Sequence, residues 1–303
     1  MEYGACEETE DQAWQTTGGP PTRAIPEVVT DYLTQAGFIH VARMRYIQID
    51  ASLISALVER WRPETHTFHM TQGEMTITLQ DVADILGLPT DGIVVVGSTN
   101  EDWPVVCAAA FGAVPEANEF HHSGDLRISF LDRLYTRWTD HAGDHDREIY
   151  FTRAHIAHML GCWLLADKSG GSNIGCQLVP LLVGRFDEIG RFSWGFAVLA
   201  HLFRNLCECI DVGRSDMGGC HILLQIWAWI RFPSIALPLP PYPEPDTYYG
   251  PPTFKIVGTR PLFLRDGINP LSNLRTTFME ARKIPFKINY GRSIACTNWT
   301  SSI

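Results

Sequence analysis

Apolar residues recur at helical spacing through much of the chain, and residues that favour helix ends bound many of these segments. Over residues 51–61, Leu53, Leu57 and Trp61 share one stripe behind Asp50, a residue type that favours helix N-termini. The same reasoning predicts helices over residues 26–36, 79–86, 103–111, 126–138, 148–166, 178–186, 194–210, 220–230 and 272–279.

After Pro63 the alternation of polar and apolar residues has a period of two, which is typical of a half-buried strand. Thr71-Gln72-Gly73 interrupts it as a turn, so we predict a β-hairpin near residues 65–78. Thr78 then begins the helix of residues 79–86, with Asp81 as the acidic partner in a capping box.

Two further segments lack a helical period. The apolar run of residues 93–96 predicts either an edge strand or a buried extended segment. Residues 233–252 are so rich in proline that they have to be extended or polyproline-like.

These patterns predict a mainly α protein, a single large helical domain with the small β-hairpin near residues 65–78. Residues 1–22 are acidic, with few core-forming side chains, and we expect a disordered tail there. The domain is then expected over residues 23–303, with residues 233–252 as an extended loop within it.

Composition supports a globular chain with no general affinity for nucleic acid. The 303 residues are 45% hydrophobic and carry a formal charge of −10, which opposes the electrostatic attraction that dominates DNA binding. A uniformly basic DNA clamp is thereby excluded, although arginines could still recognise phosphate locally.

Cysteine usage and hydropathy bear on the compartment. The eight cysteines are too few for a disulfide scaffold, and we expect buried thiols at Cys107, Cys162, Cys207 and Cys220. Neither a targeting peptide nor an apolar run of membrane-spanning length stands out. We therefore expect a reducing intracellular environment and no membrane partner.

Three groups of residues invite a catalytic interpretation. Residues 143–146 (GDHD) are similar to a metallophosphatase element, but its companion motifs are missing. Cys207 and Cys209 with 220–221, or His155 with His158, offer zinc ligands at spacings that fit no usual zinc module. Each set is more typical of a polar loop or of packed side chains.

Lys168, beside Asp167 in a glycine-containing loop, is the candidate Schiff-base lysine for a pyridoxal-phosphate enzyme. No phosphate cup accompanies it, and the usual phosphate-loop, dinucleotide and nucleophile-elbow motifs are absent. We predict no cofactor. Residues 78–89 are similar to the first helix of a helix-turn-helix, yet no basic recognition helix follows.

Four blocks of sequence stand out by their length and order: residues 36–43 (AGFIHVAR); residues 57–70 (LVERWRPETHTFHM) with 73–76 and 78–89; residues 159–170 with 180–194 (PLLVGRFDEIGRFSW); and residues 216–233 (DMGGCHILLQIWAWIRFP). These blocks resemble the plant mobile domain family, also called aminotransferase-like plant mobile domain. The resemblance extends over most of residues 25–290.

The resemblance implies a mostly helical domain of transposable elements and captured plant genes. It further implies a non-enzymatic nuclear protein, with roles in transposon and gene silencing, genome stability and meristem maintenance. We expect it to act through protein partners, among them a phosphatase 7-like protein. The tail after Tyr290 departs from the family pattern, which is compatible with a truncated, transposon-derived copy. The alternatives are a direct nucleic-acid-binding domain of transposon origin and a hydrolase or cofactor enzyme with an unrecognised site.

The resembling blocks also supply the candidate interaction or structural residues. At the helix-to-hairpin junction, we expect a charge-assisted pair of arginine and glutamate side chains to hold the junction while Trp61 packs inward, and a similar arrangement at Trp194. The alternative is that these tryptophans and arginines line a groove for a peptide or a nucleic-acid strand. The full set is Arg60, Trp61, Arg62, Glu64, His66, Asp81, Asp167, Lys168, Asp187, Arg191, Trp194, Trp227 and Trp229.

Overall fold

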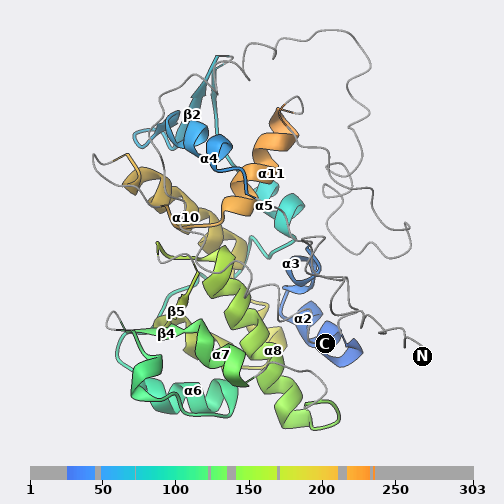
Figure 1. Ribbon diagram of the computed structural model, residues 1–303. Helices are drawn as coiled ribbons and strands as arrows, with labels where there is room; N and C mark the ends of the chain where they lie inside the picture. The colour runs from blue at the N-terminus through green and yellow to red at the C-terminus, as the bar shows by residue number, and fades with distance from the viewer. Residues whose placement is uncertain are drawn as a thin grey trace, which may run out of the picture.

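The computed structural model describes residues 26–44, 49–71, 73–121, 124–134, 141–168, 171–210, 217–232 and 235. Helices dominate them, and two small antiparallel sheets lie at opposite ends of the helical body (Figure 1). The predicted mainly α class is confirmed. The helices are α2 (Glu27–Gln35), α3 (Ile39–Ala42), α4 (Ala51–Val58), α5 (Leu79–Leu86), α6 (Trp103–Phe111), α7 (Ile128–Leu134), α8 (His145–Met159), α9 (Phe186–Ile189), α10 (Trp194–Glu208) and α11 (His221–Arg231).

Helix ends follow the capping residues in the sequence. The Asp50 carboxylate accepts hydrogen bonds from the backbone N–H groups of Ser52 and Leu53, and so begins α4. Thr78 and Asp81 form the predicted capping box at the start of α5. Gly87 ends α5 in the left-handed conformation that glycine adopts without strain.

The predicted hairpin is present and has a third strand. Strands β1 (Trp61–Arg62), β2 (Thr67–Met70) and β3 (Gly73–Met75) form an antiparallel sheet in that order. The helix predicted over residues 51–61 is therefore too long at its end. Trp61 leaves the helix because it pairs with Phe68 across the sheet, and both side chains are buried there.

The helix predicted over residues 126–138 is wrong at its start. Strand β4 (Asp125–Arg127) pairs with β5 (Asn173–Gly175), with Leu126 opposite Ile174 in the core, and α7 begins only at Ile128. The paired strand arrives from nearly fifty residues away, which a local pattern cannot indicate. The end of this predicted helix lies outside the described residues.

Helix α8 begins at His145, three residues earlier than predicted, because Asp144 caps it. It continues as a π-helical turn, η3 (Leu160–Leu164), before the chain reaches β5. The segment predicted as a helix over residues 178–186 is instead the 3-10 helix η4 (Cys176–Leu182), which contains Pro180, followed by α9. A further 3-10 turn, η1 (Ala117–Glu119), precedes β4.

The apolar run of residues 93–96 is not buried. Ile93 makes a single parallel bridge to Phe192, while Val94 and Val96 expose 59% and 68% of their surface. Gly92 permits this close crossing, because its φ is +109° and a Cβ there would stand 2.2 Å from the Arg191 carbonyl oxygen. The run is thus a surface segment whose first residue is fixed to the start of α10.

Large aromatic residues hold the helices together. Trp61, Trp194 and Trp227 are fully buried, each on a different element, within one continuous hydrophobic core. The expectation of buried thiols is confirmed at Cys107 and Cys220, whereas Cys162 and Cys207 are half-buried.

Several predictions concern residues outside the described ranges: the acidic tail of residues 1–22, the helix over 272–279 and, apart from Ile235, the proline-rich segment of 233–252. Among the described helices, none has the length and apolar character needed to cross a membrane.

Candidate functional site

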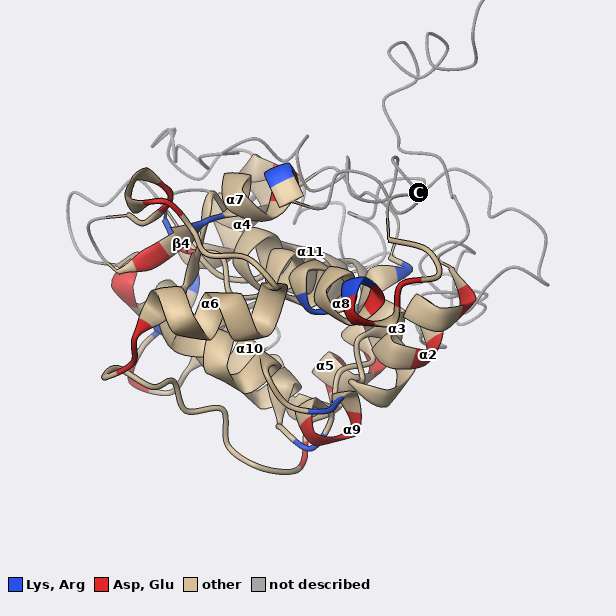
Figure 2. Ribbon diagram, turned by 90° about the horizontal axis from the view of Figure 1, so that it is seen from below, with Lys and Arg blue, Asp and Glu red and all other residues tan. Residues whose placement is uncertain are grey.

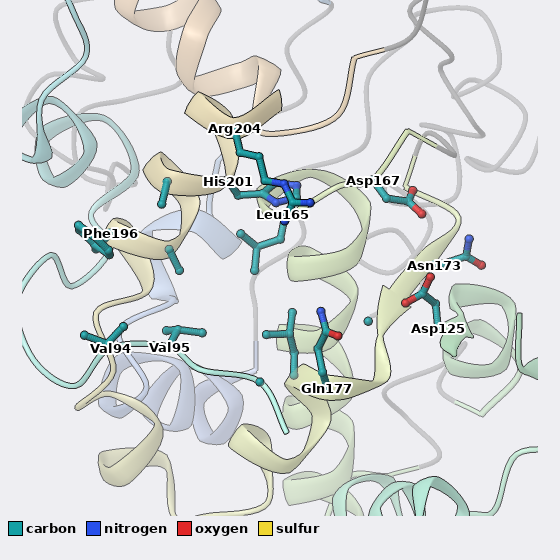
Figure 3. A pocket seen from close by; sticks show the side chains of 15 residues that line it. Val94, Val95, Asp125, Leu165, Asp167, Asn173, Gln177, Phe196, His201 and Arg204 are labelled. Carbon is teal, nitrogen blue, oxygen red and sulfur yellow. The ribbon is translucent and has the colours of Figure 1, made fainter. Parts of the chain in front are cut away.

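A cleft of about 430 Å³ opens between the segment around Val94, helix α10, and the strands β4 and β5 (Figure 3). Elements from four separate parts of the sequence contribute to it. Its lining is Val94, Val95, Gly97, Asp125, Leu165, Asp167, Asn173, Gly175, Gln177, Leu178, Phe196, Ala197, Ala200, His201 and Arg204.

One side of the cleft is apolar. Phe196 on the first turn of α10 lies on the same side as Val94 and Val95 (Figure 3). Phe196 exposes 46% of its surface and Val94 59%, whereas side chains of this size are mostly buried in proteins. Exposed apolar side chains beside a concavity are typical of a surface that another molecule covers.

The other side is polar and acidic. Asp125 on β4 and Asp167 after η3 lie across the cleft from Val94, with Asn173 beside them and Gln177 below (Figure 3). The β4–β5 pairing positions Asp125, since it stands opposite Gly175 in the sheet. The cleft therefore offers carboxylates at one end and hydrocarbon at the other.

The arginine of the cleft shares one carboxylate with a neighbouring lysine. Arg204 Nε donates to Glu208 Oε1 at 2.9 Å, and Lys168 Nζ donates to Glu208 Oε2 at 2.6 Å. Both hydrogen bonds lower the pKa of Glu208, to about 2, and the bond from Lys168 has the larger effect. The neighbouring His201 is held in place because its Nε2 lies 3.1 Å from the Ala166 carbonyl oxygen.

The edge of the cleft also presents unused backbone groups. Ile93 N–H donates to the Arg191 carbonyl, and Ser98 N–H donates to the Gln177 carbonyl. Between these anchors, the backbone groups of Val94, Val95 and Val96 make no hydrogen bond to any described residue. An extended segment that lies alongside could pair with them.

The predicted junction residues surround a packed aromatic cluster. Trp61 is fully buried between Phe68 and Phe203, and its Nε1 donates to Cys207 Sγ at 3.3 Å. His66 is exposed, has a φ of 52° and stacks on Phe203. These residues lie on the β1–β3 sheet and on α10, and none lines the cleft.

The charged members of that predicted set differ in exposure. Arg62 is exposed and donates to the Trp61 carbonyl, Arg60 is half-buried, and Glu64 is exposed in the turn after β1.

The second predicted junction lies where α9 leads into α10. Trp194 is fully buried and its Nε1 donates to the Ile189 carbonyl at 2.9 Å. Asp187 pairs with Arg185 at 2.8 Å and more loosely with Arg191 at 4.0 Å. Hydrogen bonding from Arg185, which is the largest cause, lowers the pKa of Asp187.

The remaining predicted residues tie α11 to its neighbours. Asp81 forms an ion pair with Arg231 at 2.7 Å, which joins the start of α5 to the end of α11. Trp227 is fully buried and Trp229 is 3% exposed, so neither side chain offers a surface. Of the thirteen predicted residues, the structure places Asp167 in the cleft and Lys168 at its margin.

Sequence reasoning missed the cleft residues for identifiable reasons. Phe196 follows Trp194 by two positions on α10, so the two side chains face different sides of the helix. Because α10 has many apolar residues, its sequence does not show that Phe196 lies outside the buried stripe. Asp125 and Gln177 reach the cleft through a strand pair of large sequence separation. The apolar run around Val94 was the detectable signal in the sequence, because no strand partner could be assigned to it.

The catalytic alternatives find little geometric support in the described part of the chain. It contains no group of three His, Cys, Asp or Glu side chains that could hold a metal ion. Lys168, the candidate Schiff-base lysine, is paired with Glu208. Asp144 of the GDHD element caps α8 and pairs with Arg147, as an ordinary helix start does.

A family model, the plant mobile domain, matches residues 37–253. The chain is 39% identical over 204 residues to the serine/threonine-protein phosphatase 7 long form homolog of Arabidopsis thaliana, covering 67% of this chain and 15% of that protein. It is 38% identical to Arabidopsis protein MAIN-LIKE 2 (66% of this chain, 29% of that protein) and 37% identical to Arabidopsis protein MAINTENANCE OF MERISTEMS (65% and 41%). It thus spans less than half of each relative. No solved structure matches the chain.

Proposed function

Since the chain belongs to the plant mobile domain family, we propose that it is a non-enzymatic protein-interaction domain of the nucleus, which acts in transposon and gene silencing. The cleft is its binding surface. Two relatives are named for meristem maintenance or likeness to it, and one is named as a phosphatase 7 homolog. The names of the first two support a role in meristem maintenance, and a role in genome stability and a phosphatase 7-like partner are further parts of the proposal.

The single observation that carries this proposal is the exposure of Phe196 and Val94 at the rim of a 430 Å³ cleft. Because Phe196 and Val94 expose only 46% and 59% of their surface, covering each of them contributes about 1 kcal/mol. The two side chains together help to hold a short segment of another protein, and pairing with the backbone groups of residues 94–96 adds to this. An apolar wall beside unused backbone groups fits an extended peptide.

The partner segment has a definable chemistry. An aliphatic or aromatic side chain covers Phe196 and Val94, and the backbone pairs with the unused groups of residues 94–96. A lysine or arginine a few positions away faces the polar side of the cleft, which Asp125 and Asp167 line. The occupant is thus an extended basic-apolar segment of a different protein.

Site-specific photocrosslinking in plant nuclei tests this assignment. A photoreactive phenylalanine analogue at position 196 should capture a peptide in which an apolar residue stands near a lysine or arginine. A crosslink to an acidic peptide, to a second copy of this chain or to its own proline-rich segment would overturn the assignment.

The captured sequence, made as a synthetic peptide, then allows a matched comparison by calorimetry. Val94→Ser should weaken binding about tenfold, and Val105→Ser should leave it unchanged. Val105 is a fair control because it is 62% exposed on α6 and lies outside the cleft. Equal affinities of the two variants would contradict the proposal.

The nuclear and silencing roles need their own measurements. A fluorescently tagged chain should accumulate in nuclei, and its loss should raise transposon transcripts. Restoring the wild-type chain, or Val105→Ser, should silence these transcripts again, whereas Val94→Ser should not. Transcripts that do not respond to loss of the chain would count against the silencing role.

A further inference from the structure

A threonine stands in an exposed acidic loop that leads into α6. The loop spans residues 98–102, and Thr99, Asn100, Glu101 and Asp102 are all exposed. Among the described residues, no Lys or Arg forms an ion pair with either carboxylate. The loop therefore presents a hydroxyl followed by two negative charges that no nearby cation neutralises.

The sequence around this loop is acidic over a long stretch. Residues 63–126 contain ten Asp or Glu residues and neither Lys nor Arg, although the chain has 24 Lys and Arg residues in all. Negative charge that no cation offsets attracts a basic groove on another protein. The charge pattern thus favours an enzyme that selects acidic residues over one that selects basic residues.

The backbone of the loop is held only at its two ends. Ser98 N–H donates to the Gln177 carbonyl, and the Asp102 side chain caps α6. Between these anchors, the backbone of residues 99–101 and the Thr99 side chain make no hydrogen bond to any described residue. An enzyme can therefore draw Thr99 into its active site without unpairing a sheet or unwinding a helix.

A hydroxyl with an acid three residues later also occurs elsewhere, in less accessible settings. Thr78 caps α5 and Ser129 lies within α7, so a helix would have to unwind before either could be modified. The acid that follows Thr71 is Glu74, which is already bonded to two side chains of β2. Among these residues, Thr99 combines an exposed acceptor with exposed carboxylates.

We propose that Thr99 is a phosphorylation site for an acid-directed protein kinase, whose basic groove holds the carboxylates two and three residues after the acceptor. Glu101 and Asp102 stand at these positions. Ser98 is the poorer acceptor, because it is half-buried and its Oγ already donates to Glu101 Oε1 at 2.8 Å. Modification of Thr99 does not require the cleft to bind a partner.

The reaction is a phosphoryl transfer from ATP, which the kinase binds. Thr99 Oγ forms a bond to the γ-phosphorus while the bond from that phosphorus to the β,γ-bridging oxygen breaks. ADP leaves, and the hydroxyl proton passes to a carboxylate of the kinase. The product carries about 1.5 to 2 additional negative charges near neutral pH.

The added charge lies close to the cleft along the chain. Gly97, two residues before Thr99, lines the cleft, so the phosphate makes the potential at this rim more negative. A basic partner segment should then bind more tightly, and this effect should weaken as salt is added. This consequence rests on the proposed function, whereas the phosphorylation itself does not.

Casein kinase II, an acid-directed kinase, tests the site on the full chain with ATP and peptide mapping by mass spectrometry. We expect stoichiometric phosphate on Thr99, and Thr99→Ala should remove the phosphate from residues 98–102. Protein kinase A, which selects arginine before the acceptor, should leave Thr99 unmodified, because Arg62 is the nearest Lys or Arg before it.

A double variant, Glu101→Gln with Asp102→Asn, removes the two charges and keeps the local structure. Glutamine can still accept from Ser98, and asparagine caps a helix as well as aspartate does. Casein kinase II should modify this variant about tenfold more slowly or less, because two charge-assisted contacts are lost. Asp91→Asn is the matched control, since Asp91 is exposed but lies eight residues before Thr99, and it should leave the rate unchanged.

Two results would overturn the assignment: phosphate that stays on the loop in Thr99→Ala, or a double variant modified as fast as wild type. The effect on the cleft has a separate measurement, which compares the affinity of the captured peptide for the phosphorylated and unphosphorylated chains. Equal affinities would refute this effect, and an unphosphorylated chain that binds no peptide would refute the proposed function, while the phosphate on Thr99 would be detected in both cases.

Discussion

At the scale of single residues, the resembling blocks are rich in tryptophan because these side chains close the core. Trp61 packs against two aromatic rings, with centroids 4.8 Å and 5.0 Å away on Phe68 and Phe203, and its side chain is fully buried. Its indole N–H has a partner in Cys207. A tryptophan so enclosed contributes to folding and cannot contact a partner protein.

Trp61→Ala should therefore destabilise the protein by about 3–5 kcal/mol, which is usual when a large buried side chain is truncated. Urea unfolding measures the loss. Trp61→Phe should recover part of it, since the phenyl ring keeps most of the contacts and loses the hydrogen bond to Cys207. A Trp61→Ala protein of wild-type stability that fails to bind its partner would place this residue in the interaction surface instead.

His155 makes stability depend on pH. Burial, and secondarily the neighbouring His158, lowers its pKa from 6.5 to about 3. Between these values the unfolded chain binds a proton that the folded chain does not, so the free energy of unfolding falls as pH decreases below about 6.5. His221 acts in the same direction, since burial lowers its pKa to about 4.

The urea concentration at which half of the protein is unfolded should be lower at about pH 5 than at about pH 7. This difference should be smaller in the His155→Gln variant. The pH range matters because Glu208, whose pKa is lowered to about 2, adds stability that is lost only as pH falls below its ordinary 4.5. An identical pH dependence in His155→Gln would mean that other groups cause the loss.

At the scale of elements, Asp81 links two helices that lie 150 residues apart in the sequence. Its Oδ2 accepts from the Thr78 backbone in the capping box, while Oδ1 accepts from Arg231 on α11. One carboxylate thus begins α5 and fixes it to the last described helix. The resembling block that contains Asp81 has a structural reason for an acidic residue at this position.

Removing the cap and removing the ion pair should have separable effects. Thr78→Ala should cost about 1 kcal/mol, the usual value for a lost N-cap. Arg231→Met should cost less, because surface ion pairs contribute at most about 1 kcal/mol. In double-mutant cycles, the effects of Asp81→Ala and Arg231→Met on the free energy of unfolding should not add up, because the two residues form the ion pair. The effects of Thr78→Ala and Arg231→Met should add up. Coupling of Thr78 with Arg231 would refute this division.

Elements with local signals were predictable, and those that depend on distant partners were not. Helices α2, α4, α5, α6, α10 and α11 follow from stripes and caps within their own residues. Strand β4 and the early end of α4 depend on pairing with residues that the local pattern does not contain. The cleft was missed for the same reason, since its two walls come from segments that meet only in the fold.

At the scale of the whole molecule, charge separates protein recognition from nucleic-acid recognition. The chain carries a formal charge of −10, and Lys and Arg are spread over separate elements among acidic residues (Figure 2). Many arginines in the described part of the chain already have carboxylate partners: Arg133 with Glu119, Arg147 with Asp144, Arg185 and Arg191 with Asp187, Arg204 with Glu208 and Arg231 with Asp81.

Binding to a phosphate backbone would require these pairs to break, so we expect only weak affinity for nucleic acid. Fluorescence anisotropy with a labelled DNA duplex at about 200 mM salt should give a Kd no tighter than about 10⁻⁴ M. A double variant, Glu119→Gln with Asp187→Asn, releases arginines from both pairs and should bind more tightly at low salt if electrostatics limits the interaction.

Micromolar affinity of the wild-type chain, falling steeply with salt, would favour a DNA-binding domain of transposon origin. The cleft would then be secondary, because a surface that neutralises several phosphates outweighs the roughly 2 kcal/mol available from Phe196 and Val94.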